Sequence, residues 1–215
     1  MRFTRRSGGG QDRSDVGETD AQPARETHAP LEPKGPYDVS EVDVEDTPLV
    51  DLGSLLVTPG EAMELQLQVD EESGTVMAVV LVGEEGALEL RAFAASRGTE
   101  AWAELRPLIA EETQRMGGSC EEQEGSFGLE LLCQVPVQTP DGQQATQVSR
   151  ILGHEGPAWL LRATLMGRPA LEPATAAAWE DTIRRTVVRR GRAAMPPGSA
   201  LPLTLPPEAR RVDQP

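Results

Sequence analysis

The stretches Leu90-Arg91-Ala92-Phe93 and Leu161-Arg162-Ala163-Thr164 decide the fold that we expect for this chain. Each closes an apolar stretch with the pattern of a strand, and each is followed by an amphipathic helical pattern that carries a tryptophan. The tryptophan is Trp102 after the first copy and Trp179 after the second. The chain therefore divides into two similar halves, each a meander of strands followed by a helix.

Four strands are predicted before the first helix. In residues 63–69 apolar side chains take every second position, which is typical of a strand with one polar face. Residues 75–82 are almost wholly apolar and β-branched, which indicates a central strand covered on both faces. Together with residues 54–57 and 87–94, these segments predict an antiparallel meander in the order of the sequence.

The first helix is expected to begin after Thr99, which can cap it, and to end at Gly117-Gly118. Pro107 lies inside the pattern, so either the helix is kinked there or its regular part begins there. Residues at helical spacing define the side that we expect to be buried: Trp102, Leu105, Leu108, Ile109 and Met116.

The second half repeats this plan. Its strands are expected at residues 119–124, 128–137, 145–152 and 158–166, and the last two form a hairpin around a turn at residues 153–156. The second helix begins near Pro173 and buries Trp179, Ile183 and Val187. The predicted fold class is α+β, a twisted and mainly antiparallel sheet flanked by two main helices.

Composition divides the chain into three parts. Residues 1–46 hold almost no large apolar side chains and are expected to be a disordered head, because they cannot offset the entropy of ordering. Residues 47–192 hold the apolar patterns and are expected to form a single domain. Residues 193–215 are a tail rich in proline and leucine, which predicts an extended segment and not a helix.

The tail has leucines at every second position with prolines between them, so an extended strip would have one apolar edge. That edge either lies back across its own domain or docks on another protein. The tail residues that would make either contact are Met195, Pro196, Pro197, Leu201, Leu203 and Leu205.

The chain has a net charge of −15, and residues 49–188 hold 22 acidic against 9 basic side chains. Nucleic-acid binding needs Lys and Arg to neutralise phosphates, so we expect no direct nucleic-acid binding by the folded core. The longest apolar run, Val76 to Val82, is far too short to cross a membrane, and the first charges are not followed by the apolar segment of a signal peptide. We therefore expect a soluble, cytoplasmic protein with no membrane partner.

No group of residues has the pattern of a catalytic, metal or cofactor site. His28 lies in the predicted head and His154 in the predicted turn, where Glu155 alone does not complete a metal site. There is no Gly-x-Ser-x-Gly motif and no phosphate-binding loop after a strand. The sequence therefore predicts no cofactor, no metal and no catalytic residue, and it points away from an enzyme without excluding one.

Cys120 and Cys133 are the two cysteines of the chain, and their spacing is neither that of a zinc site nor that of a redox motif. In a reducing cytoplasm we expect two thiols, with Cys133 buried as a small apolar side chain. The alternative is a regulatory disulfide between neighbouring strands.

Arg91 and Arg162 hold equivalent places in the two halves, and each interrupts an otherwise apolar strand. The expected role of each is to point outward or to pair with a carboxylate across the sheet. If both instead face one groove, they form a cationic spot in an acidic domain. Such a groove would be a ligand site suited to a carboxylate or a phosphate.

Four stretches carry a family resemblance: Asp51-Leu52-Gly53-Ser54-Leu55, Gly156-Pro157-Ala158-Trp159-Leu160-Leu161-Arg162, Met195-Pro196-Pro197 and Leu201-Pro202-Leu203. Through them the chain resembles an actinobacterial family, the domain of unknown function 3710, over about residues 35–207. The resemblance implies no activity, cofactor or catalytic residue. Members of that family tend to be encoded near a dUTPase and an OB-fold protein, which implies nucleic-acid housekeeping by association. The order of elements is also similar to the Mog1/PsbP-like α/β sandwich, a weaker likeness that would not decide function.

These observations favour a cytoplasmic, non-enzymatic protein-interaction module, with the acidic face and the apolar tail as contact surfaces for a protein partner. Two alternatives stay open. One is a small-ligand-binding protein or an enzyme that uses Arg91, Arg162 and nearby carboxylates in a groove. The other is an accessory factor of nucleic-acid metabolism that is recruited through protein contacts.

Overall fold

The computed structural model of the protein describes residues 31–139 and 141–206. Within these residues the main sheet has seven strands in the spatial order β4-β5-β6-β10-β9-β8-β7, and each neighbouring pair is antiparallel. The strands are β4 (Glu64–Val69), β5 (Val76–Gly83), β6 (Gly86–Ala94), β7 (Ser119–Gly125), β8 (Gly128–Gln138), β9 (Gln144–Gly156) and β10 (Trp159–Gly167).

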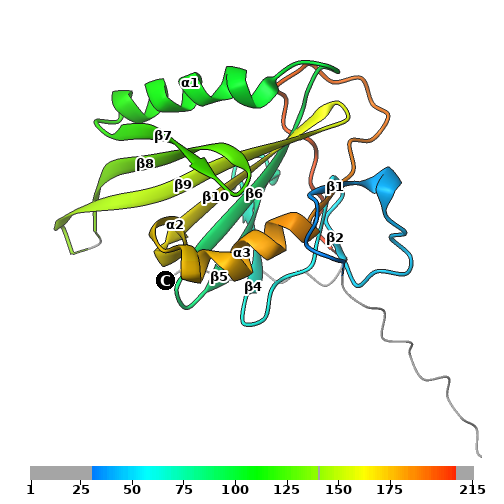
Figure 1. The fold of residues 1–215 in the computed structure, drawn as a ribbon, viewed down its shortest axis with the longest axis horizontal. Helices are drawn as coiled ribbons and strands as arrows, with labels where there is room; N and C mark the ends of the chain where they lie inside the picture. The colour runs from blue at the N-terminus through cyan, green and yellow to red at the C-terminus, as the bar shows by residue number, and fades with distance from the viewer. Residues whose placement is uncertain (1–30, 140, 207–215) are drawn as a thin grey trace, which may run out of the picture.

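Two meanders meet in the middle of this sheet (Figure 1). The first runs through β4, β5 and β6, the second through β7, β8, β9 and β10, and β6 pairs with β10. Helices follow each meander: α1 (Ala101–Arg115) after β6, then α2 (Arg168–Leu171) and α3 (Pro173–Arg185) after β10. The predicted fold class, an α+β protein built from two meander-plus-helix halves, is confirmed.

The helices α1 and α3 cover opposite faces of the main sheet. Trp102 of α1 packs with Leu160, whereas Trp179 of α3 belongs to the larger core that contains Leu161. Neighbouring residues of a strand point to opposite faces, so these two contacts place the helices on opposite sides. In Figure 1 α1 runs along the end of the sheet formed by β7 and β8, and α2 and α3 lie apart from α1.

A small second sheet completes the larger core. Its order is β1 (Tyr37–Asp38), β11 (Val187–Val188), β3 (Leu55–Val57) and β2 (Val50–Asp51), with β1 parallel to β11. The prediction that the strand at residues 54–57 joins the first meander is therefore wrong. All three residues of β3 are buried. Their sequence therefore shows no alternation of apolar and polar side chains from which the sheet they join could be predicted.

Residues 31–46, which were predicted to belong to the head, include β1 and contact the domain. The Tyr37 N–H donates to the carbonyl of Thr186, and the indole Nε1 of Trp159 donates to Asp38 Oδ2 at 2.8 Å. A short 3-10 turn, η1 (Val39–Glu41), follows. Backbone pairing and one hydrogen bond from an indole anchor this segment. Amino-acid composition does not predict either contact. Residues 1–30 of the predicted head lie outside the described residues.

The helix α1 differs from its prediction at its start and on its buried side. Thr99 does not cap it; the Trp102 N–H donates instead to Glu155 Oε1 of β9 at 2.5 Å. Leu108 and Met116 are 59% and 52% exposed. The side of the helix that faces β7, β8 and β9 includes Ala101, Trp102, Leu105, Ile109 and Thr113, and Leu108 and Met116 lie off this side.

The predicted turn at residues 153–156 belongs to β9, and the chain reverses at Pro157-Ala158 instead. His154 is consequently a strand residue opposite Leu161. Gly153 and Gly156 both lie in the strand. These positions need glycine because a side chain at 153 would collide with the ring of Trp102, and one at 156 with the ring of Trp159.

The helix α3 begins at Pro173 and buries Trp179 and Ile183 as predicted. Val187 is buried as well, but it lies in β11 and not in the helix. Thr186 is extended, with ψ at 135°, so the chain leaves the helix before it reaches Val187.

The tail crosses from one sheet to the other. Ala200 bridges to Phe93 of β6, and Leu203 bridges to Gly53 beside β3. Leu201 is buried at 4% exposure, and Met195 and Leu203 pack against the larger core. Pro196 and Pro197 are exposed, and Leu205 is 52% exposed. Met195, Leu201 and Leu203 of the tail thus face the domain, whereas Leu205 does not.

Candidate functional site

Arg91 and Arg162 lie directly opposite each other at the centre of the main sheet. The β6–β10 register pairs them, and it also pairs Leu90 with Ala163 and Ala92 with Leu161. The two repeated tetrapeptides therefore face each other across one strand boundary. Paired residues of neighbouring strands share a face, so both guanidinium groups lie on the same side of the sheet.

The two guanidinium groups share one aromatic neighbour, Phe93. Their central carbons lie 5.5 Å (Arg91) and 5.7 Å (Arg162) from the centroid of the Phe93 ring. These distances are within the range of cation–π attraction. Phe93 thus offers each of the two charges a cation–π contact.

The charges of this pair are unevenly compensated. Arg162 Nη2 donates to Glu89 Oε1 at 2.9 Å, whereas Arg91 has no ion pair or side-chain hydrogen bond among the described residues. The Nε atoms of both arginines are buried without a hydrogen-bond partner. Burial lowers the pKa of Arg91, and the positive charge of Arg162 lowers it further. The side chains remain protonated, so the pair keeps an uncompensated positive charge.

The arginines lie on a part of the sheet that α1 does not cover. The helix contacts β7, β8 and β9, and its Trp102 rests on Gly153, the β9 residue opposite Arg162. The half-buried side chains on the same face of β5, β6 and β10 belong to neither core cluster. We call this surface the open sheet face: Val80, Ala87, Glu89, Arg91, Phe93, Arg162, Thr164 and Met166.

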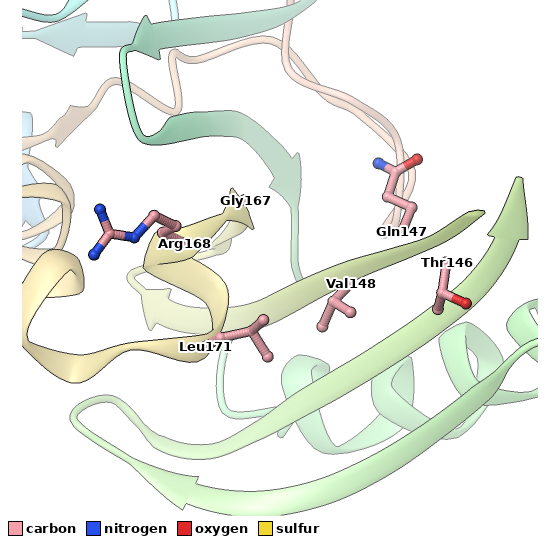
Figure 2. A pocket seen from close by; sticks show the side chains of 6 residues that line it. All are labelled: Thr146, Gln147, Val148, Gly167, Arg168 and Leu171. Atoms are coloured by element: carbon pink, nitrogen blue, oxygen red, sulfur yellow. The ribbon is translucent and has the colours of Figure 1, made fainter. Parts of the chain in front are cut away.

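A hollow of about 350 Å³ lies elsewhere, between β9 and α2. Figure 2 shows Val148 and Leu171 lining it and Arg168 directed away from them. The Arg168 guanidinium binds Glu85 and Glu172, so it is not free for a ligand. The hollow is mainly apolar and includes neither Arg91 nor Arg162. The two arginines therefore share a face, and this face is not part of the hollow.

Cys120 and Cys133 form a disulfide, so the prediction of two thiols is wrong. They are opposite residues in the β7–β8 register, with Cα atoms 4.1 Å apart. Cys133 is buried, as expected. The spacing of 13 residues does not reveal this pairing, because register depends on the turn at Ser126-Phe127.

Glu130, Arg150 and Glu180 form an ionic cluster beneath α3 that the sequence did not reveal. Arg150 donates to Glu180 Oε1 at 2.5 Å, and Arg150 Nε lies 3.5 Å from Glu130 Oε2. Burial raises the pKa of Glu130. Burial acts to raise the pKa of Glu180 too, but hydrogen bonds from Ser126 and Arg150 hold it below its ordinary value. The cluster ties α3 to β8 and β9, and its burial indicates a structural role.

His154 lies in β9 beside Trp159. Its ring centroid lies 6.1 Å from that of Trp159, and burial lowers its pKa. The described part of the chain contains no group of three His, Cys, Asp or Glu residues that could hold a metal ion. None of its helices is both long and apolar enough to span a membrane.

The comparisons with known proteins agree with the resemblance noted in the sequence. The family described as "Protein of unknown function (DUF3710)" matches residues 35–212, which is most of the chain. The similarity to the Mog1/PsbP-like sandwich stays a prediction. A comparison with curated proteins found no match. Because the match runs from β1 through both meanders and into the tail, this chain belongs to the DUF3710 family.

Proposed function

We propose that this protein is a non-enzymatic protein-interaction module and that the open sheet face is its docking surface. One observation carries the proposal: Arg91 and Arg162 lie side by side on a half-buried face that neither α1 nor α3 covers. Aromatic and arginine side chains are enriched in protein interfaces, and here both arginines lie near the ring of Phe93.

The shape of this surface favours a protein partner over a small molecule. Small ligands bind in concave pockets that enclose most of their surface. The hollow beside Leu171 contains neither arginine. A broad sheet face can instead contribute the area that a protein interface needs.

The charge of the chain limits the kind of partner. A net charge of −15 disfavours direct binding of nucleic acid. An accessory role in nucleic-acid metabolism would therefore operate through protein contacts on the same face.

Site-specific photo-crosslinking in the native cell tests this proposal. A photoreactive amino acid replaces Thr164 on the open sheet face in one variant and Ala177, exposed on α3, in the control. We expect a discrete protein adduct from position 164 and none of that mass from position 177. Equal adducts at both positions, or no adduct at position 164, would overturn the proposal.

A further inference from the structure

We propose that the open sheet face recognises a carboxylate of its partner, held by Arg91 and Arg162 beside the ring of Phe93. The partner segment is a peptide with one acidic side chain between apolar neighbours. This inference rests on the proposed function, since it names the chemistry by which the docked protein is recognised.

The local charge balance supports this assignment. Two guanidinium groups face each other, and within the described residues Glu89 is the one carboxylate that binds either of them. Like charges directly opposite each other in a sheet are destabilising. A guanidinium group presents a planar fork of donors that matches a carboxylate. A second carboxylate would therefore pair with Arg91 and relieve the repulsion.

The surroundings indicate the flanks of the peptide. Val80, Ala87 and Met166 lie half-buried on the same face and contribute apolar surface around the arginines. Apolar neighbours of the acidic residue would cover these side chains. The N-terminus of α1 does not compete for the carboxylate, because Glu155 already accepts from the Trp102 N–H.

The same surroundings favour a single carboxylate over a polyanion. Glu84 and Glu85 lie in the turn between β5 and β6, and residues 49–188 hold 22 acidic side chains. A strand of nucleic acid would bring many phosphates against this acidic surface. One carboxylate with apolar flanks would contact the arginines and would experience little repulsion from the acidic side chains.

Arginine side-chain NMR of the full-length protein tests the carboxylate site without the partner. The probe is N-acetylglutamate methylamide, which carries a glutamate side chain in a peptide-like frame. Its glutamine analogue and sodium chloride are the controls, and inorganic phosphate is a third ligand. We expect saturable shifts of the Nε–H signals of Arg91 and Arg162 with the glutamate probe and none with its glutamine analogue.

Matched variants assign the signal to the site. Arg91→Gln should abolish saturation, and Arg91→Lys should weaken it because the charge remains and the planar fork is lost. Arg115→Gln is the control, since Arg115 is exposed on α1 and binds Glu111 and Glu112. Absence of saturation in the unchanged protein, equal shifts with chloride, or tighter binding of phosphate would each overturn the assignment. The backbone spectrum of each variant reports whether the fold is retained.

The crosslinking experiment separates failure of this inference from failure of the proposed function. An adduct at Thr164 that is lost with Arg91→Gln and kept with Arg115→Gln supports both. An adduct that persists unchanged with Arg91→Gln overturns the carboxylate site and leaves the docking face standing. Absence of any adduct in the unchanged protein overturns the docking face, and the NMR titration still decides whether the arginines bind a carboxylate.

Discussion

The indole of Trp102 in α1 packs directly on the backbone of Gly153 in β9, in space that a side chain at position 153 would occupy. The indole Nε1 also donates to the carbonyl of Leu129 at 2.7 Å. This contact attaches α1 to the sheet, and it places the start of the helix beside the strand that carries Arg162.

Gly153→Ala should therefore destabilise the protein, because its methyl group would displace the Trp102 ring. We expect a loss of about 1–3 kcal/mol in the free energy of unfolding, as for other overpacked sites. Urea denaturation measures it. Gln144→Ala, at the exposed start of the same strand, should change stability by less than about 0.5 kcal/mol. Equal stability of Gly153→Ala and the unchanged protein would contradict the packing.

Reduction of the Cys120–Cys133 disulfide should lower the free energy of unfolding. The bond closes a loop of 13 residues, and a loop of that size is worth about 3 kcal/mol in the chain-entropy treatment. Urea denaturation with and without a dithiol reductant measures the difference. A double variant with alanine at both positions should show no response to the reductant. If the unchanged protein also fails to respond, the two cysteines are not bonded.

Leu201→Ala should destabilise the protein, whereas Leu205→Ala should not. Leu201 is buried at 4% exposure and Leu205 is 52% exposed, so the two substitutions remove the same atoms from opposite environments. Buried leucine-to-alanine changes cost about 2–5 kcal/mol. Thermal or urea denaturation compares the variants. Equal and small effects at both positions would mean that the tail does not complete the core.

The buried Glu130 should make stability fall as the pH rises above its ordinary pKa. Burial raises the pKa of Glu130 above 4.5 in the folded protein, so the folded state binds this proton more readily than the unfolded chain. The stability that Glu130 contributes is therefore present below pH 4.5 and is lost as the pH rises through the folded pKa. Urea denaturation across this range measures the slope.

Glu130→Gln supplies the matched comparison, because glutamine keeps the shape and does not titrate. As the pH rises, we expect the free energy of unfolding of the variant to increase relative to that of the unchanged protein. A difference that does not change with pH would show that Glu130 has no raised pKa.

Much of the fold was predicted from local patterns. The strands β4 to β10 were each expected within a few residues of their bounds, and α3 begins at Pro173 as predicted. The errors arose where a distant segment changes the surroundings. Thr99 has capping chemistry, yet Glu155 of β9 caps α1. Gly153 and Gly156 are typical of a turn, yet they lie in a strand. Glycine is required there because two tryptophan rings occupy the space of a side chain.

The candidate site was predicted in its residues but not in its geometry. Arg91 and Arg162 were singled out because they hold equivalent places in a repeat. A repeat does not indicate whether its copies are neighbours. The β6–β10 pairing decides that, and it also decides that Glu89 binds Arg162 and leaves Arg91 without a carboxylate. Cys120 and Cys133, likewise, are bonded through a register that their spacing does not reveal.

The sequence by itself determined the type and order of the elements, because strand alternation, helical spacing and turn residues act over a few neighbouring positions. Only the tertiary structure decided which strands pair, which face each helix covers, and which charges meet. These outcomes depend on contacts between residues far apart in the chain, such as the 71 positions that separate Arg91 from Arg162. The open sheet face is one such outcome, since it is the surface that remains after the two halves have paired and the helices have packed.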